Sequence, residues 1–208
     1  MLATLPWSYA HPNALEFSRD GNLLAYGMGT LPTVSLWDVR KRRPSHVLAG
    51  AGGDFDFSPD GRTLVASYHF ESIRFWNVQT GQLLPQPVIG WESTGHPATV
   101  AYSPDGRLIA SGGSDLRPSR GLLRFFFKSA PSRSIGGIVK ISDARSGEEL
   151  WSEKVSKNGS VIAVVFSPDG KWLAVSTDGG RAKVMLWSVQ ASFTVPRKKA
   201  PPTPAKGT

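Results

Sequence analysis

Cysteine is absent from the 208 residues of the sequence. Its absence excludes disulfide bonds, thiolate metal sites and cysteine nucleophiles, and it suits a reducing compartment. The N-terminus also lacks the basic segment and apolar core of a signal peptide, and no stretch approaches the roughly 18 apolar residues of a membrane-spanning helix. We therefore expect a soluble cytoplasmic protein.

Catalytic motifs are missing as well. The sequence has no Gly-x-Ser-x-Gly elbow, no phosphate loop ending in Gly-Lys-Ser/Thr and no His-Glu-x-x-His, and its four histidines are scattered. Asp54 and Asp56 alternate along one expected strand and would face the same side. That arrangement permits a cation site, but we favour solvation of the strand end and the turn. We predict no enzymatic activity, no catalytic residue, no cofactor and no metal.

A short motif occurs four times: an aromatic residue, a serine and, two residues later, Asp-Gly. Its copies are 17–21, 57–61, 102–106 and 166–170, with aromatic residues spaced 40, 45 and 64 residues apart. Proline presets φ near −65° in three copies, aspartate can bond the backbone two residues on, and glycine accepts a positive φ. Each copy therefore predicts a tight turn between two strands, and such turns at this period favour four-stranded propeller blades over helical solenoids.

Short runs with strand patterns flank every turn. The expected first strands are 14–17, 99–102 and 161–166, the second strands 23–26, 63–67, 108–111 and 172–176, the third strands 34–38, 73–77, 139–143 and 184–188, and an outer strand 149–151. Residues 161–166 are apolar at every position, which predicts an inner strand buried on both faces.

With these turns and strands the sequence resembles the WD-repeat β-propeller family, in its regular bacterial-type form with four copies of the repeat. The resemblance covers roughly residues 4–190 and implies an all-β fold of four blades, each of four antiparallel strands. We expect residues 1–190 to form this propeller, incomplete or open. The family implies a non-catalytic scaffold for protein–protein interaction, with proteins or peptides and no small-molecule substrate as partners. Some propellers are hydrolases, but the sequence shows no paired acids or triad for that chemistry.

WD-repeat blades usually carry a hydrogen-bonded set of His, Ser or Thr, Asp and Trp, and this sequence keeps the set only in pieces. The third repeat has serine where the other third strands have Trp. We therefore expect packing between blades to provide most of the stability. The resemblance assigns structural roles to Trp37, Trp76, Trp187, His96, Ser111, Asp115 and Asp178.

Positive charge is concentrated in two segments. The formal net charge is +8, and residues 114–137 and 191–208 each have four more basic than acidic residues. The first segment is an expected loop inserted in the third repeat, and in the family this loop lies on the face most often used for ligands. Its phenylalanines either fold back onto the blade or protrude as a contact element. The candidate partner-binding residues are Arg117, Arg120, Arg124, Phe125, Phe126, Phe127 and Lys128.

Residues 191–208 are rich in Pro and Lys, and we predict a disordered tail. Such a tail either keeps a protein soluble or tethers it weakly to polyanions. Together the two basic segments support an alternative function, the binding of nucleic acid or an anionic membrane, with an affinity that falls steeply as salt rises.

Closure of the ring is a further expectation. In the family an N-terminal strand joins the first blade to the last, and residues 4–9 are the candidate for it. The family commonly closes with about seven blades, so four would leave two apolar faces exposed. We expect the chain to pair with a second copy or to be part of a longer propeller, and we favour a closed four-bladed ring less.

Overall fold

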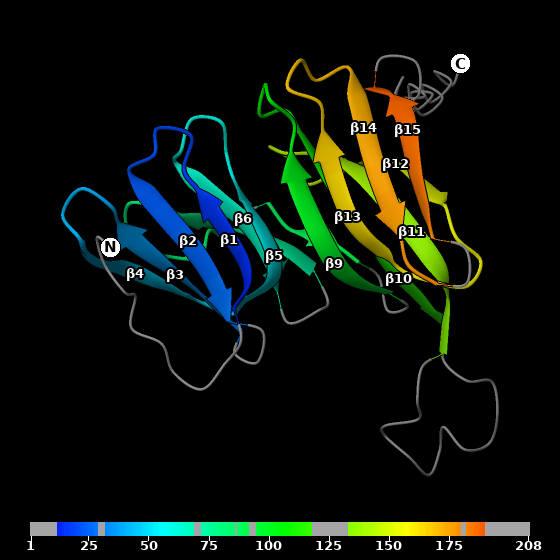
Figure 1. The fold of residues 1–208 in the computed structure, drawn as a ribbon, viewed down its shortest axis with the longest axis horizontal. Helices are drawn as coiled ribbons and strands as arrows, with labels where there is room; N and C mark the ends of the chain where they lie inside the picture. The colour runs from blue at the N-terminus through cyan, green and yellow to red at the C-terminus, as the bar shows by residue number, and fades with distance from the viewer. Residues whose placement is uncertain are drawn as a thin grey trace, which may run out of the picture.

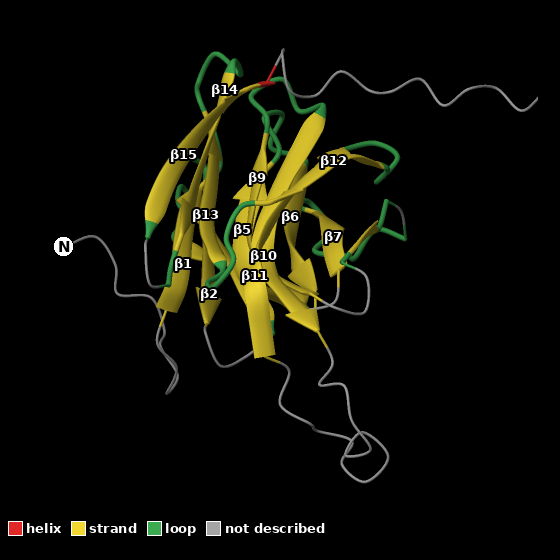
Figure 2. Cartoon of the chain, turned by 90° about the vertical axis from the view of Figure 1, so that its right-hand side faces the viewer, coloured by secondary structure: helices red, strands yellow, loops and turns green. Residues whose placement is uncertain are grey.

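The computed structural model describes residues 12–28, 32–68, 72–85, 87–91, 95–117, 133–179 and 182–189. These residues form β-strands joined by turns (Figures 1 and 2). The strands are β1 (Pro12–Phe17), β2 (Leu23–Met28), β3 (Thr33–Asp38), β4 (Arg43–Ala49), β5 (Ala51–Phe57), β6 (Thr63–Tyr68), β7 (Ser72–Asn77), β8 (Ile89–Gly90), β9 (Gly95–Tyr102), β10 (Leu108–Arg117), β11 (Arg133–Asp143), β12 (Glu149–Lys154), β13 (Val161–Phe166), β14 (Trp172–Thr177) and β15 (Lys183–Ser188).

The strands form four antiparallel sheets, one for each repeat. Sheet 1 has the order β1-β2-β3-β4, sheet 2 β5-β6-β7-β8, sheet 3 β9-β10-β11-β12 and sheet 4 β13-β14-β15. In each sheet the Asp-Gly turn joins the first two strands, as the sequence predicts. Sheet 4 has three strands in the described part of the chain, and residues 4–9, the predicted N-terminal strand, lie outside it.

Neighbouring sheets pack face to face in sequence order, from the blue sheet 1 to the orange sheet 4 in Figure 1. Alternation along each strand sends apolar side chains to both faces of sheets 2 and 3, so three apolar clusters form between the four sheets. The clusters centre on Leu36, Phe57 and Trp76, on Phe75, Trp91 and Ile109, and on Ile141, Val164 and Leu173. Sheets 1 and 4 each have one described neighbour, and they lie at opposite ends of the row.

Two sequence expectations need correction. Part of the expected loop 114–137 is strand, because β10 continues to Arg117 and pairs there with Arg133 of β11. The run 161–166 is buried on only one face: Ile162 and Val165 are 54% and 57% exposed, since no described sheet packs against that side of sheet 4.

Candidate interaction site

The four Asp-Gly turns share one hydrogen-bonding pattern. The serine hydroxyl donates to the aspartate carboxylate at 2.6–2.7 Å in every copy. The same carboxylate accepts the N–H two residues later at 3.0–3.1 Å, and the serine oxygen accepts the N–H five residues later at 2.9–3.0 Å. The turn glycines have φ between 68° and 73°, which favours glycine. Each turn is therefore held by its own side chains.

These bonds also affect the turn carboxylates. The serine hydroxyl of the same turn lowers the pKa of Asp60, Asp105 and Asp169, with the backbone N–H adding to the effect. In the first turn the N–H of Asn22 makes the largest contribution to the lowered pKa of Asp20. The four turns therefore carry ionised aspartates at neutral pH.

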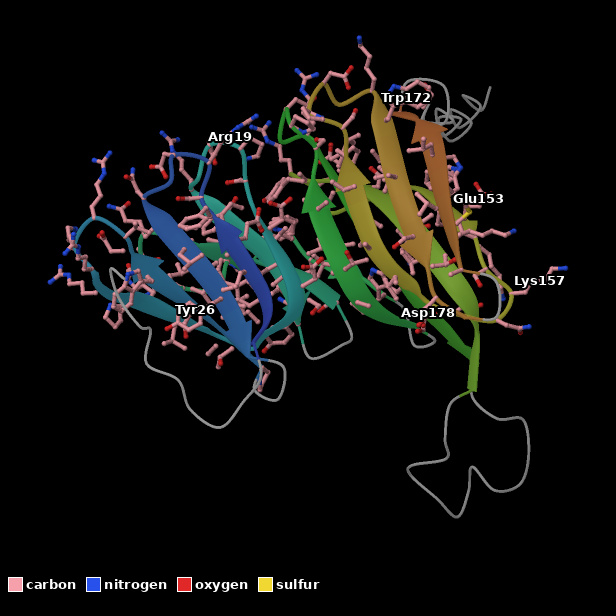
Figure 3. All side chains as sticks on the ribbon, viewed as in Figure 1. Arg19, Tyr26, Glu153, Lys157, Trp172 and Asp178 are labelled. Carbon is pink, nitrogen blue, oxygen red and sulfur yellow. The ribbon has the colours of Figure 1, made fainter. Side chains whose placement is uncertain are left out.

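The turns of all four sheets border one open hollow of about 240 Å³. The four sheets pack face to face with their inner strands β1, β5, β9 and β13 adjacent to one another in that order. This packing brings the four turns together. Figure 3 shows Arg19 and Trp172 at this upper end of the molecule and Asp178 at the opposite end. The lining residues are Glu16, Phe17, Arg19, Asp56, Phe57, Ser58, Pro59, Tyr102, Ser103, Pro104 and Pro168.

The side of the hollow formed by the inner strands carries a pair of hydrogen-bonded carboxyl groups, Glu16 and Asp56. Burial, the hydrogen bond to Asp56 and the charge of Asp56 together raise the pKa of Glu16 from 4.5 to about 9, and the N–H of Phe57 opposes the shift. Burial likewise raises the pKa of Asp56 and Asp54. At neutral pH the Glu16 carboxyl therefore keeps its proton and donates it to Asp56.

The same carboxyl groups join neighbouring sheets. Asp56 accepts the N–H of Tyr102 at 2.6 Å. Asp54 accepts the hydroxyl of Thr99 at 2.8 Å and the N–H of Val100 at 3.2 Å. Sheet 3 has Ala101 at the position of Asp56. In this sheet the hydroxyl oxygen of Thr99 instead accepts the N–H of Val164 from sheet 4, at 3.3 Å. Side chains of each inner strand thus bind the backbone of the next.

The predicted partner-binding residues fall almost entirely outside the description. Residues 118–132, which include Arg120, Arg124, Phe125–Phe127 and Lys128, lie outside the described part of the chain. Arg117 ends β10, and its side chain is also outside the description. Their role in partner binding therefore stays a prediction.

The three tryptophans with expected structural roles differ in burial. Trp76 is 1% exposed between sheets 1 and 2, with its ring centroid 6.3 Å from that of Tyr68. Trp187 is half-buried against sheet 3 and contacts Trp151 edge to face at 6.3 Å. Trp37 is half-buried in sheet 1, on the face that has no described neighbouring sheet.

The polar members of the expected blade network have separate partners. Ser111 is fully buried and accepts the indole N–H of Trp91 at 3.1 Å. Asp115 forms an ion pair with Lys154 at 3.1 Å, and Asp178 accepts the N–H of Ser160 at 2.5 Å. His96 lies in β9, with its side chain outside the description.

Sequence reasoning missed Trp91. This residue follows the short strand β8 of sheet 2, is 3% exposed and packs into the cluster between sheets 2 and 3. Its ring also lies under the ammonium group of Lys140, 5.3 Å from the centroid, while Lys140 pairs with Glu149 at 2.8 Å. The sequence signal for this contact is the serine that replaces Trp in the third strand of the third repeat. This replacement leaves Ser111 without an indole partner from its own repeat.

In residues 12–189, outside the gaps given above, no group of three or more His, Cys, Asp or Glu side chains could hold a metal ion. The same residues contain no helix that is long and apolar enough to cross a membrane.

Comparison with known proteins places this architecture. The family model of the WD domain, G-beta repeat, matches residues 90–116 and 150–188, which lie mainly in sheets 3 and 4. WD repeat-containing protein SL1-17 of Schistosoma mansoni is 29% identical over 154 residues, which cover 73% of this chain and 42% of that protein. These matches support a WD-repeat family for the chain. Its four antiparallel sheets are consistent with the blades of a WD-repeat β-propeller, and in the described part of the chain they do not close into a ring.

Other WD-repeat relatives match shorter parts of the chain. Small ribosomal subunit protein RACK1z of Arabidopsis thaliana is 31% identical over 102 residues, covering 49% of this chain and 23% of the relative. MST50-interacting protein 11 of Pyricularia oryzae is 27% identical over 123 residues, covering 59% and 31%. The chain spans less than half the length of each relative named here.

Proposed function

We propose that this WD-repeat chain is a non-catalytic scaffold for protein–protein interaction, and that a partner protein or peptide contacts it at the hollow bordered by the four turns. The observation that carries the proposal is that all four repeats contribute to this one hollow and hold their turns with the same bonds. A partner would meet a preformed surface, which reduces the entropy lost on binding.

Two further points support a scaffold. The Glu16–Asp56 pair, which could suggest acid–base chemistry, already uses its proton and acceptors to join sheets through Phe57 and Tyr102. One relative is named as an MST50-interacting protein and another as a ribosomal subunit protein, so both names refer to association with other macromolecules.

Site-specific cross-linking tests the proposed surface. A photoreactive phenylalanine analogue would replace Arg19, at the turn end, or Glu153, on the exposed strand β12 (Figure 3). We expect irradiation of cells to attach discrete protein partners to the Arg19 variant and not to the matched Glu153 variant. Identical products from both positions, or none from Arg19, would contradict contact at the hollow.

Polyanion binding is the second candidate. A groove of about 720 Å³ between sheets 1 and 2 is lined by Lys41, Arg43 and Arg62, with Asp38 as its carboxylate. These cations add to the basic segments predicted at 114–137 and 191–208. If this function holds, the chain retains single-stranded RNA or anionic vesicles, and retention falls steeply between about 50 and 200 mM salt. Binding to neither ligand at low salt would exclude it.

A second copy of the chain is also among the proposed partners. The apolar faces left open at the two ends of the row of sheets favour self-association, because monomeric proteins rarely expose large contiguous apolar surface.

A further inference from the structure

The open face of sheet 4 carries apolar residues whose counterparts are buried in sheets 1, 2 and 3. Two apolar positions of the third strand are 0–2% exposed in sheets 1 to 3. Their counterparts in β15, Val184 and Leu186, are 75% and 66% exposed. The strand register establishes the equivalence. Leu186 pairs with Ala174 of the second strand, and Leu36, Phe75 and Ile141 pair with the matching residues of the second strands of their own sheets. The buried counterparts are Val34 and Leu36, Ile73 and Phe75, and Val139 and Ile141.

The rest of this face is apolar too. Ile162, Val165 and Trp172 are 54%, 57% and 50% exposed. Ala174 and Ser176 of β14 lie among them, and none of these side chains is charged. In sheets 1 to 3 the corresponding face packs against the next sheet, and sheet 4 has no described sheet in that place.

Sheet 1 has the opposite face open. Phe17 is 58% exposed, whereas its equivalents Phe57 and Phe166 are 5% and 7% exposed because a preceding sheet packs on them. Leu15 and Val47 on the same side of sheet 1 are 63% and 62% exposed. Tyr26 of this side is buried, so the exposure is concentrated on the inner and outer strands, β1 and β4.

We propose that two copies of the chain associate head to tail, with the open face of sheet 4 of each copy packed on the open face of sheet 1 of the other. This inference rests on the self-association proposed above and specifies its surfaces. Each copy has one open face of each kind. Within a copy, the kind of face that is open in sheet 4 packs on the kind of face that is open in sheet 1 at every contact between consecutive sheets, namely between sheets 1 and 2, 2 and 3, and 3 and 4. A second copy therefore covers both faces at once.

The symmetry is consistent with known propellers. Two copies related by a twofold axis contribute four sheets each, and a ring of eight blades lies within the usual range of about four to eight. Val165, at the position of Asp56, then faces the inner strand of the other copy's sheet 1.

Light scattering of the purified 208-residue chain tests the pairing, and we expect twice the chain mass of 22.5 kDa. Leu186→Glu and Phe17→Lys should each yield monomers, because each places a charge in both copies of the interface. Leu83→Glu, at an exposed apolar position outside both faces, is the matched control and should remain a dimer. Circular dichroism of the monomeric variants checks that the sheets persist.

Mixing the two monomeric variants gives the sharpest test. An equimolar mixture should recover dimers that contain one copy of each variant, because one of their two interfaces is unaltered and the other places Glu opposite the Lys side. A monomeric wild-type chain would overturn self-association itself. A wild-type dimer that survives Phe17→Lys would overturn the head-to-tail arrangement only, and open-ended higher oligomers would overturn the closed ring.

Discussion

Replacing Trp76 by alanine is expected to lower the free energy of unfolding by about 3–5 kcal/mol. The indole is 1% exposed in the cluster between sheets 1 and 2, and its removal leaves a cavity that the paired strands β6 and β7 cannot fill. Urea denaturation followed by fluorescence of the remaining tryptophans measures the loss.

The matched substitution is Trp37→Ala at the equivalent position of sheet 1. Trp37 is half-buried because no described sheet packs on its face, so the expected loss is less than half of that for Trp76. Trp187, packed on one neighbour and on Trp151, should be intermediate. Equal losses at Trp37 and Trp76 would contradict the assignment of sheet 1 as an end sheet.

Replacing Glu16 by glutamine is expected to stabilise the protein at alkaline pH. The folded state holds the Glu16 proton with a pKa of about 9, while the unfolded chain releases it near 4.5. The folded state therefore binds more protons between these values, and stability falls as pH rises through that window. Glutamine keeps the donor to Asp56 and the acceptor for the N–H of Phe57 but does not titrate.

The size of the effect follows from the linkage slope, at most about 1.4 kcal/mol per pH unit. Glu16 is only half-buried, so we expect a smaller gain of about 1–3 kcal/mol for Glu16→Gln at pH 8. Glu153→Gln removes an exposed carboxyl and is the control. The turn aspartates have lowered pKa values, so their contribution is lost in acid, below this window. Parallel stability curves for wild type and Glu16→Gln between pH 5 and 9 would refute the shared proton.

Much of the fold could be predicted from the sequence because its signals are local. Aspartate and glycine at fixed spacing define each turn, and alternation defines the strands on either side. The extension of β10 to Arg117 could not be predicted, since residues 114–117 and 133–137 show no alternation and are ordered as strand by pairing with each other.

The candidate site was less predictable because it depends on contacts between repeats. Asp54 and Asp56 could be assigned to one side of a strand, but Glu16 lies about 40 residues away, and only the packing of sheet 1 on sheet 2 brings it to Asp56. Trp91 likewise reaches Ser111 across a sheet boundary. Exposure of Val184 and Leu186 depends on the absence of a neighbouring sheet, which the pattern of one strand does not encode.

The bonds between inner strands have a consequence for cooperativity. Glu16 binds the backbone of Phe57, Asp56 that of Tyr102 and Thr99 that of Val164, so each sheet is coupled mainly to its nearest neighbours. In such a linear array the free energy of local opening is lowest where a sheet has a single neighbour, and unfolding begins by fraying of sheets 1 and 4. A ring of two copies has no end sheets. Sheets 1 and 4 of each copy would then open only when an interface between the two copies is lost.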